Sequence, residues 1–181
     1  MDNAKIIRVT RHWVEHFVIE MNLCPFVRRE LVNDRIRLLA TPASSEQELL
    51  EVLQHELIRL ENDTSIETTL LIHSNVLQSF DDYNGFLDIA DQLLTEMKLV
   101  GVYQVASFHP DYQFEGTGVG DAANYTNRSP YPMLHLLREA SLERAIDAYS
   151  EVDQIPVRNI ELMNRLGQDK LIELLELSKA L

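Results

Sequence analysis

Apolar residues follow two different spacings along the chain, and each spacing predicts a different kind of element. In some segments they recur every third or fourth position among polar residues, which is typical of helices with one buried face. Elsewhere they form short runs rich in Leu, Ile, Val and Thr, which are typical of buried strands. The helical pattern covers residues 4–21, 45–61 and 82–98, and the strand pattern covers residues 35–40, 67–73 and 102–108.

After the first helix, these segments alternate as strand, helix, strand, helix, strand. Successive strands joined by a helix usually pair in parallel when they are neighbours in a sheet. We therefore expect an α/β or α+β fold, in which helices pack on a mostly parallel sheet of three or slightly more strands. A ferredoxin-like α+β sandwich with an antiparallel edge is nearly as compatible with the pattern.

The C-terminal part of the chain shows helical spacing only. Helices are predicted over residues 132–149, 156–166 and 168–181. A chain of 181 residues is most simply one domain. We expect that domain to span residues 1–181, with the C-terminal helices from about residue 155 packing on its core.

A polar stretch, residues 107–138, leads from the last predicted strand into the next helix. Connections of this length inside a compact domain are usually functional or disordered. The stretch contains five aromatic residues, in which disordered segments are poor, so we expect a functional site here. Ligands of open α/β sheets lie beyond the carboxyl ends of strands. His73 and His109 each follow a strand and are therefore expected near one rim of the sheet.

Arginine and asparagine side chains in this stretch suggest a site for an anionic small molecule. Arg128 and Arg138 are predicted to bind the anion, because a guanidinium group binds carboxylate or phosphate with two hydrogen bonds. The helix start expected near Pro132 would add a partial positive charge. The ligand-binding candidates are Asn124, Asn127, Arg128, His135 and Arg138. The alternative, left equally open, is that these side chains only hydrogen-bond the backbone of their own loop.

Three residues are candidates for catalysis. His109 and Asp111 are able to act as general acid and base. Cys24, which precedes a proline, is able to form a thiol–imidazole pair with His109 or His135. The alternative is that Cys24 serves only as a small buried apolar residue.

A divalent metal ion is the cofactor that the residue types allow. His73, His109 and Asp111 would supply two imidazoles and a carboxylate, which are the ligands of open metal sites. The chain has neither a His-Glu-x-x-His nor a Cys-x-x-Cys motif. Histidines in apolar runs, such as His73 and His135, are more often hydrogen-bonded core residues.

The composition narrows the partners. Sixteen basic against 29 acidic residues give a net charge of −13, which argues against binding to nucleic acid or an anionic membrane surface. A single cysteine excludes an intrachain disulfide and fits a reducing cytosol. No apolar run approaches the roughly 18 residues of a membrane span, and no signal peptide is recognisable. We expect a soluble, cytoplasmic protein.

Three phrases in the sequence carry a family resemblance. They are Asn-Leu-Cys-Pro-Phe at residues 22–26, Phe-His-Pro-Asp-Tyr-Gln-Phe at 108–114 and the segment from Asn124 to Glu139. They resemble a bacterial family catalogued as a domain of unknown function, number fourteen-fifteen, and the resemblance runs along nearly the whole chain. The family has no assigned activity, cofactor or catalytic residue, so the resemblance implies no function.

These observations favour a small-molecule site in residues 107–138, with an anionic ligand and a hydrolase or transferase activity as the leading hypothesis. The alternatives are a metal-dependent hydrolase or redox protein, and a non-enzymatic interaction protein with an exposed apolar face. The sequence indicates neither a substrate nor an oligomeric state, and it leaves open whether the protein is an enzyme at all.

Overall fold

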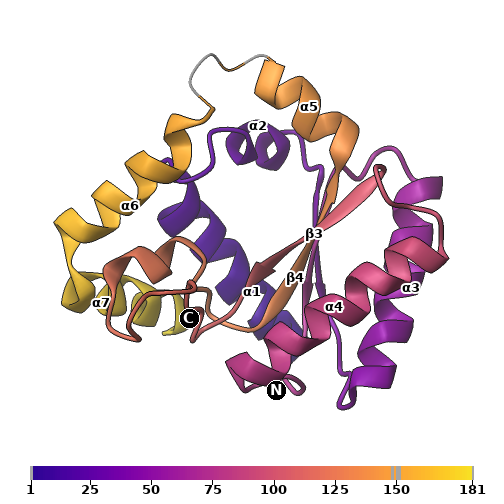
Figure 1. The fold of residues 1–181 in the computed structure, drawn as a ribbon, viewed down its shortest axis with the longest axis horizontal. Coiled ribbons are helices and arrows are strands. Elements are labelled where there is room, and N and C mark those ends of the chain that lie inside the picture. Colours follow the sequence, from indigo (N-terminus) through magenta and orange to yellow (C-terminus); the bar gives the residue numbers. More distant parts are fainter. Residues whose placement is uncertain (1, 148, 150–151, 181) are drawn as a thin grey trace.

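The computed structural model describes residues 2–147, 149 and 152–180. Its centre is a four-stranded sheet with helices on both faces (Figure 1). The strands are β1 (Ile36–Ala40), β2 (Thr68–Ile72), β3 (Tyr103–Phe108) and β4 (Met133–Arg138), in the spatial order β1-β2-β4-β3. β1 and β2 pair in parallel, and β4 is antiparallel to both of its neighbours. β2 and β3 therefore run in the same direction with β4 inserted between them.

The expected α/β or α+β class is confirmed, but the expectation of a mostly parallel sheet is wrong. Among the described residues only the β1–β2 pair is parallel. The element order also differs from the β-α-β-β-α-β order of a ferredoxin-like sandwich.

The difference comes from residues 132–149, which the sequence predicted as one helix. Met133–Arg138 is instead the strand β4, and the helix α5 covers only Glu139–Asp147. A central strand is buried on both faces, so its apolar run has the same appearance as a buried helix. Pro130 and Pro132 just before it favour extended backbone at the residues that precede them.

Two long helices cover one face of the sheet, α3 (Glu46–Asn62) and α4 (Phe80–Glu96). The Ser45 hydroxyl accepts a hydrogen bond from the Glu48 amide, and the Glu48 carboxylate accepts one from the Ser44 amide. This capping agrees with the start of the helical pattern at residue 45 in the sequence. The core between these helices and the sheet includes Leu53, Leu57, Leu71, Tyr83, Phe86, Leu134 and Leu136.

The opposite face is covered by helices from both ends of the chain (Figure 1). They are α1 (Asn3–Trp13), the π-helix η1 (Val14–Ile19), α6 (Gln154–Leu166) and α7 (Gln168–Lys179), together with the 3₁₀ helix η2 (Ala122–Thr126). Their buried side chains include Trp13, Phe17, Ile72, Met133, Met163 and Leu171. The C-terminal helices thus share one core with the N-terminal helix.

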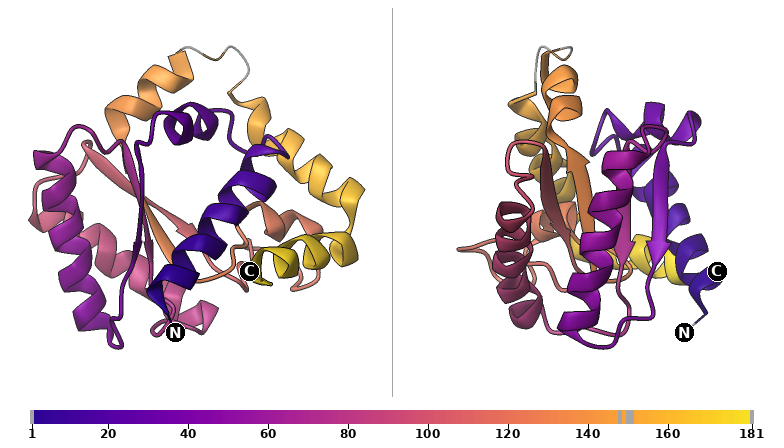
Figure 2. Two further views of the ribbon diagram at one scale, coloured as in Figure 1. Left: turned by 180° about the vertical axis from the view of Figure 1, so that it is seen from behind. Right: turned by 90° about the vertical axis from the view of Figure 1, so that its right-hand side faces the viewer.

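Two short helices lie at one end of the sheet on this face. α2 (Val27–Val32) and α5 lie at the same end of the molecule, at the top of each view in Figures 1 and 2. Neither has a fully buried residue, and α5 follows directly on β4. Within the described part of the chain, no helix has the length and apolar character that crossing a membrane requires.

Candidate ligand cavity

The long loop between β3 and β4, in which the sequence predicted the site, is closed by its own hydrogen bonds. Arg128 is 7% exposed. Its Nε donates to the Tyr112 carbonyl at 3.2 Å, and its Nη2 donates to the Val119 carbonyl at 2.8 Å. The guanidinium also lies 4.5 Å above the Tyr125 ring. These contacts tie two parts of the loop together, as in the alternative that the sequence left open.

The two candidate asparagines also hydrogen-bond to the backbone, Asn124 within the loop and Asn127 to the end of β3. The fully buried Asn124 accepts hydrogen bonds from the Phe114 amide and the Thr117 hydroxyl and donates one to the Gly118 carbonyl, at 2.8–3.0 Å. The amide nitrogen of Asn127 donates to the Ser107 carbonyl at 3.1 Å. Buried loop backbone needs such partners.

The two acid–base candidates meet through the backbone. His109 is completely buried, and its Nδ1 accepts a hydrogen bond from the Asp111 amide at 3.0 Å. Its Nε2 donates to the Leu77 carbonyl at 3.2 Å. Both ring nitrogens are therefore engaged, while Asp111 lies exposed at the surface. Burial lowers the pKa of His109, so the ring is held neutral.

His73 lies on the same rim as His109, as the strand ends suggested. Both imidazoles lie beside the Tyr83 ring, with centroids 5.8 Å and 5.1 Å away. Nδ1 of His73 donates to the Val76 carbonyl at 3.0 Å, and its Nε2 is buried without a hydrogen-bond partner among the described residues. The described residues contain no group of three or more His, Cys, Asp or Glu side chains gathered as metal ligands.

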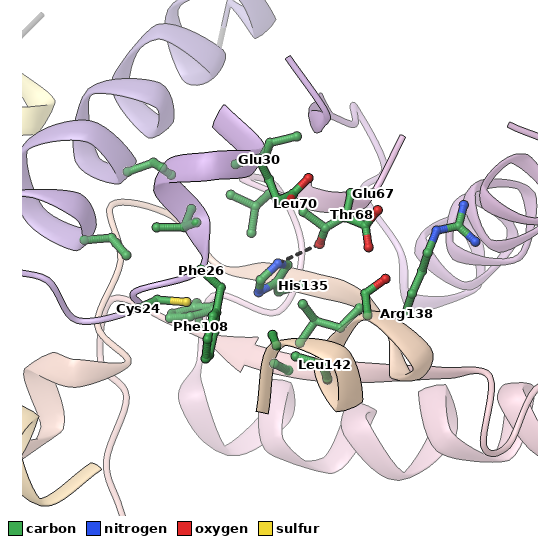
Figure 3. Close-up of a pocket in the computed structure, with 18 of the residues that line it drawn as sticks. Cys24, Phe26, Glu30, Glu67, Thr68, Leu70, Phe108, His135, Arg138 and Leu142 are labelled. Atoms are coloured by element: carbon green, nitrogen blue, oxygen red, sulfur yellow. Dashed lines mark hydrogen bonds between the residues drawn. The ribbon is translucent and has the colours of Figure 1, made fainter. Parts of the chain in front are cut away.

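Arg138, the second predicted anion-binding arginine, closes the end of α3. It donates to the carbonyls of Leu60 and Ile66 and, at 2.8 Å, to the Tyr103 hydroxyl. Figure 3 shows its guanidinium directed away from His135. Arg128 and Arg138 thus donate to different segments of the chain and share no hydrogen-bond partner.

A cavity lies elsewhere, between the sheet and the helices α1, η1, α2 and α5 (Figure 3). Its volume is about 320 Å³. Its walls are almost wholly apolar and include Trp13, Phe26, Ile36, Ala106, Phe108 and Leu142. Three of the residues singled out from the sequence, Cys24, His135 and Arg138, also line it.

The strand pairing explains why there is space at this place. Side chains alternate between the faces of a strand, so His135 faces the cavity while its neighbours Leu134 and Leu136 face α3 and α4. Ala106 pairs with His135 across the β3–β4 ladder. Its small side chain leaves the space beside the imidazole open. On the opposite wall, Val14 and Val18 project from η1, and π-helical turns often occur at functional sites.

The hydrogen bonds of His135 define the position of its proton. The Thr68 hydroxyl donates to the Leu136 carbonyl at 2.6 Å, because a carbonyl can only accept. The same hydroxyl lies 2.8 Å from Nε2 of His135, so Nε2 must be the donor to it. Nδ1 then carries a lone pair, makes no hydrogen bond among the described residues and points into the cavity (Figure 3). Burial lowers the pKa of His135 to about 4, so the ring is neutral at pH 7.

Cys24 faces the same cavity from the turn that follows η1 (Figure 3). Burial raises the pKa of its thiol above the ordinary value, against the weaker opposite effect of the Phe26 and Val27 amides. No hydrogen bond joins Cys24 to His135 in the described structure. The thiol–imidazole pair considered from the sequence therefore shares a cavity without a direct contact.

The two acidic side chains that line the cavity, Glu30 and Glu67, are paired with arginines. Arg35 bridges two acidic residues, with its Nη1 3.2 Å from a Glu30 oxygen and its Nη2 donating to Glu67. The other Glu67 oxygen lies 4.0 Å from Arg144 on α5. These carboxylates are therefore neutralised, and the guanidinium of Arg138, which also lines the cavity, is held by carbonyls and the Tyr103 hydroxyl.

The sequence did not single out Thr68 or Ala106. Their roles depend on β4, because Thr68 orients an imidazole of that strand and Ala106 pairs with the same residue. The signal that could have found them is the alternation of Met133, His135 and Leu137 with Leu134 and Leu136, read as a strand.

Fold and cavity together define an α/β protein with a helix-covered mixed sheet and a largely apolar cavity beside it. The family model described as "Protein of unknown function (DUF1415)" matches residues 5–173, and the chain belongs to this family. No curated protein and no solved structure matches the chain.

Proposed function

We propose that the protein binds a small, largely apolar molecule in the cavity beside His135. The observation that carries the proposal is a cavity of about 320 Å³ with almost wholly apolar walls, into which one unpaired ring nitrogen points. Protein interiors are otherwise close-packed, with few voids larger than a water molecule. Ligand sites, in contrast, are typically apolar spaces of this size with a few polar groups that fix orientation.

The binding energy would come mainly from burying apolar surface. Each 100 Å² of apolar ligand surface removed from water contributes roughly 2.5 kcal/mol. The aromatic rings of Trp13, Phe26 and Phe108 and the aliphatic side chains around them supply the matching contacts. The polar contact to His135 would then select among molecules that fit.

A binding experiment tests the proposal directly. Naphthalene-sized apolar probes should raise the melting temperature and change the fluorescence of Trp13, which is the single tryptophan and lines the cavity. Ala106→Leu should weaken probe binding at least about tenfold, because the larger side chain occupies the space beside His135. Ala140→Leu, on the exposed side of α5, is the matched control and should bind the probes normally.

If no probe changes either signal, or if the Ala106 and Ala140 variants bind equally well, the cavity is not a binding site. Both variants should first be shown to retain the circular dichroism of the unchanged protein.

The anionic ligand expected from the sequence is a separate proposal with weaker support. Both Arg128 and Arg138 donate to backbone carbonyls and so serve the fold. A thermal-shift screen of phosphate and carboxylate compounds on Arg128→Ala and the unchanged protein addresses it. A hydrolase or transferase step, a divalent metal and a cytoplasmic location likewise stay predictions from the sequence.

A further inference from the structure

We infer that the ligand of this cavity presents a neutral hydroxyl group, as in an apolar alcohol or phenol, to Nδ1 of His135. This inference rests on the proposed binding function and adds the chemical class of the ligand. It follows from a chain of hydrogen bonds that starts at a backbone carbonyl and ends in the cavity.

These hydrogen bonds have a fixed direction. The Leu136 carbonyl accepts from the Thr68 hydroxyl at 2.6 Å, which uses the only hydrogen of the hydroxyl. The Thr68 oxygen can then only accept from His135, at 2.8 Å. Because the backbone carbonyl can only accept, the imidazole must be the tautomer with its hydrogen on Nε2.

The cavity consequently offers a hydrogen-bond acceptor to a ligand. Nδ1 is an acceptor without a partner among the described residues, and it faces the side of the cavity that carries Cys24 and Phe26 (Figure 3). An acceptor in an apolar space is stabilised by a donor. A hydroxyl group supplies one without bringing a charge into the cavity.

A carboxylate is not the group that this acceptor favours. A carboxylate would place its lone pairs against that of Nδ1 unless the ring gained a second proton. Burial opposes the second proton, in line with the lowered pKa of the ring. An ionised acid would therefore be poorly accommodated at neutral pH.

Three probes with one naphthalene body separate these cases: 2-naphthol, 2-methoxynaphthalene and 2-naphthoate, titrated calorimetrically at pH 7.5. We expect 2-naphthol to bind about threefold to tenfold tighter than the methyl ether, in keeping with one hydrogen bond. 2-Naphthoate should bind more weakly than both. In His135→Phe, which keeps an aromatic ring but loses Nδ1, the alcohol and the ether should bind within about twofold of each other.

Thr68→Val provides a second test that keeps His135. Without the Thr68 oxygen the ring is free to place its hydrogen on Nδ1, so the preference for the alcohol over the ether should narrow. ¹⁵N NMR of the imidazole reports the tautomer directly: Nε2 should carry the hydrogen in the unchanged protein, and a mixture of tautomers should appear in Thr68→Val. A merely structural role of Thr68 would not shift this signal.

The outcomes are distinguishable. If none of the three probes binds the unchanged protein, the proposed function fails, and the inference fails with it. If the ether binds as tightly as the alcohol, or if the naphthoate binds tightest, the cavity is a site but the inferred ligand class is wrong. A hydrogen on Nδ1 in the unchanged protein would also overturn the inference, even if His135→Phe does not fold.

Discussion

His73 and His135 are both held neutral by burial, which lowers the pKa of each from 6.5 to about 4. A histidine whose pKa is lower in the folded state binds more protons when the chain unfolds. Its contribution to stability is therefore complete above pH 6.5 and is lost as the pH falls from 6.5 towards 4. Acid should destabilise this protein well before most of its carboxylates are protonated.

His73 allows that effect to be measured, because it is completely buried. Between pH 7.5 and 5.0 the depressed pKa of His73 accounts for roughly 2 kcal/mol of lost unfolding free energy. In His73→Asn, whose amide can still donate to the Val76 carbonyl, the fall in unfolding free energy over this range should be smaller by that amount. Denaturant titrations at the two pH values give the comparison.

His55→Asn serves as the control for this experiment, since it removes an exposed imidazole from α3. Its loss of stability on acidification should equal that of the unchanged protein. An equal loss in His73→Asn would show that His73 is not a source of the acid sensitivity.

Cys24 is the only cysteine, so thiol chemistry reports on one position. The thiolate is the reactive form, and burial raises the pKa of this thiol. A disulfide reagent at pH 7.5 should react with Cys24 at least about tenfold more slowly than with free cysteine. Saturating 2-naphthol should slow the reaction further, because the thiol faces the cavity.

The same reaction in denaturant supplies the reference rate for the unprotected thiol. A folded-state rate equal to or above that of free cysteine would instead favour the activated thiol that the sequence also allowed.

At the scale of elements, Asn124 is the side chain that shapes the loop between β3 and β4. Asn124→Ala removes three hydrogen bonds and leaves the Phe114 amide and the Gly118 carbonyl without this partner. We expect a loss of about 2–4 kcal/mol of stability, together with faster hydrogen exchange over residues 113–121. Mass spectrometry of the exchanged peptides shows whether the change is confined to the loop.

Asn164→Ala, at an exposed position of α6, is the matched control and should leave both measurements unchanged. If the exchange of residues 113–121 is the same in the two variants, the asparagine does not hold the loop.

Elements with a local signal could be predicted from the sequence, and β4 could not. The capping residues at the start of α3 act within four residues of one another, so the sequence alone defines that helix end. The identity of β4 depends on two distant strands, β2 and β3, that pair with its two edges. Its run of Met, Leu, His, Leu and Leu satisfies a helix or a strand equally until those neighbours are known.

The candidate site shows the same division. Residue type alone was enough to single out His135 and Cys24, because imidazole and thiol groups carry chemistry wherever they lie. Placing them in one cavity required the insertion of β4 and the positions of α2 and α5, which are tertiary facts. Arg128 was singled out for its charge. Its guanidinium instead donates to backbone carbonyls of its own long loop, which needs such partners.

For the molecule as a whole, the cavity lowers the stability of the fold. Apolar side chains that face empty space lose dispersion contacts, so filling such a space usually stabilises a protein. A fold with α3 and α4 densely packed on one face has no general need for a gap on the other. Under the proposed function, this gap is the space that the ligand fills, at a cost in stability of the free protein.

This trade-off predicts opposite effects of one substitution on stability and on binding. Without ligand, Ala106→Leu should raise the unfolding free energy by about 0.5–2 kcal/mol and the melting temperature by roughly 2–6 °C, since the added methyl groups fill apolar space. With 2-naphthol present, the difference in melting temperature between the two proteins should shrink or change sign, because the ligand stabilises only the unchanged protein. Calorimetric melting of both proteins with and without the probe gives all four values. If Ala106→Leu lowers the melting temperature without ligand, the space beside His135 is not available to a side chain, and the reasoning from cavity to ligand loses its physical basis.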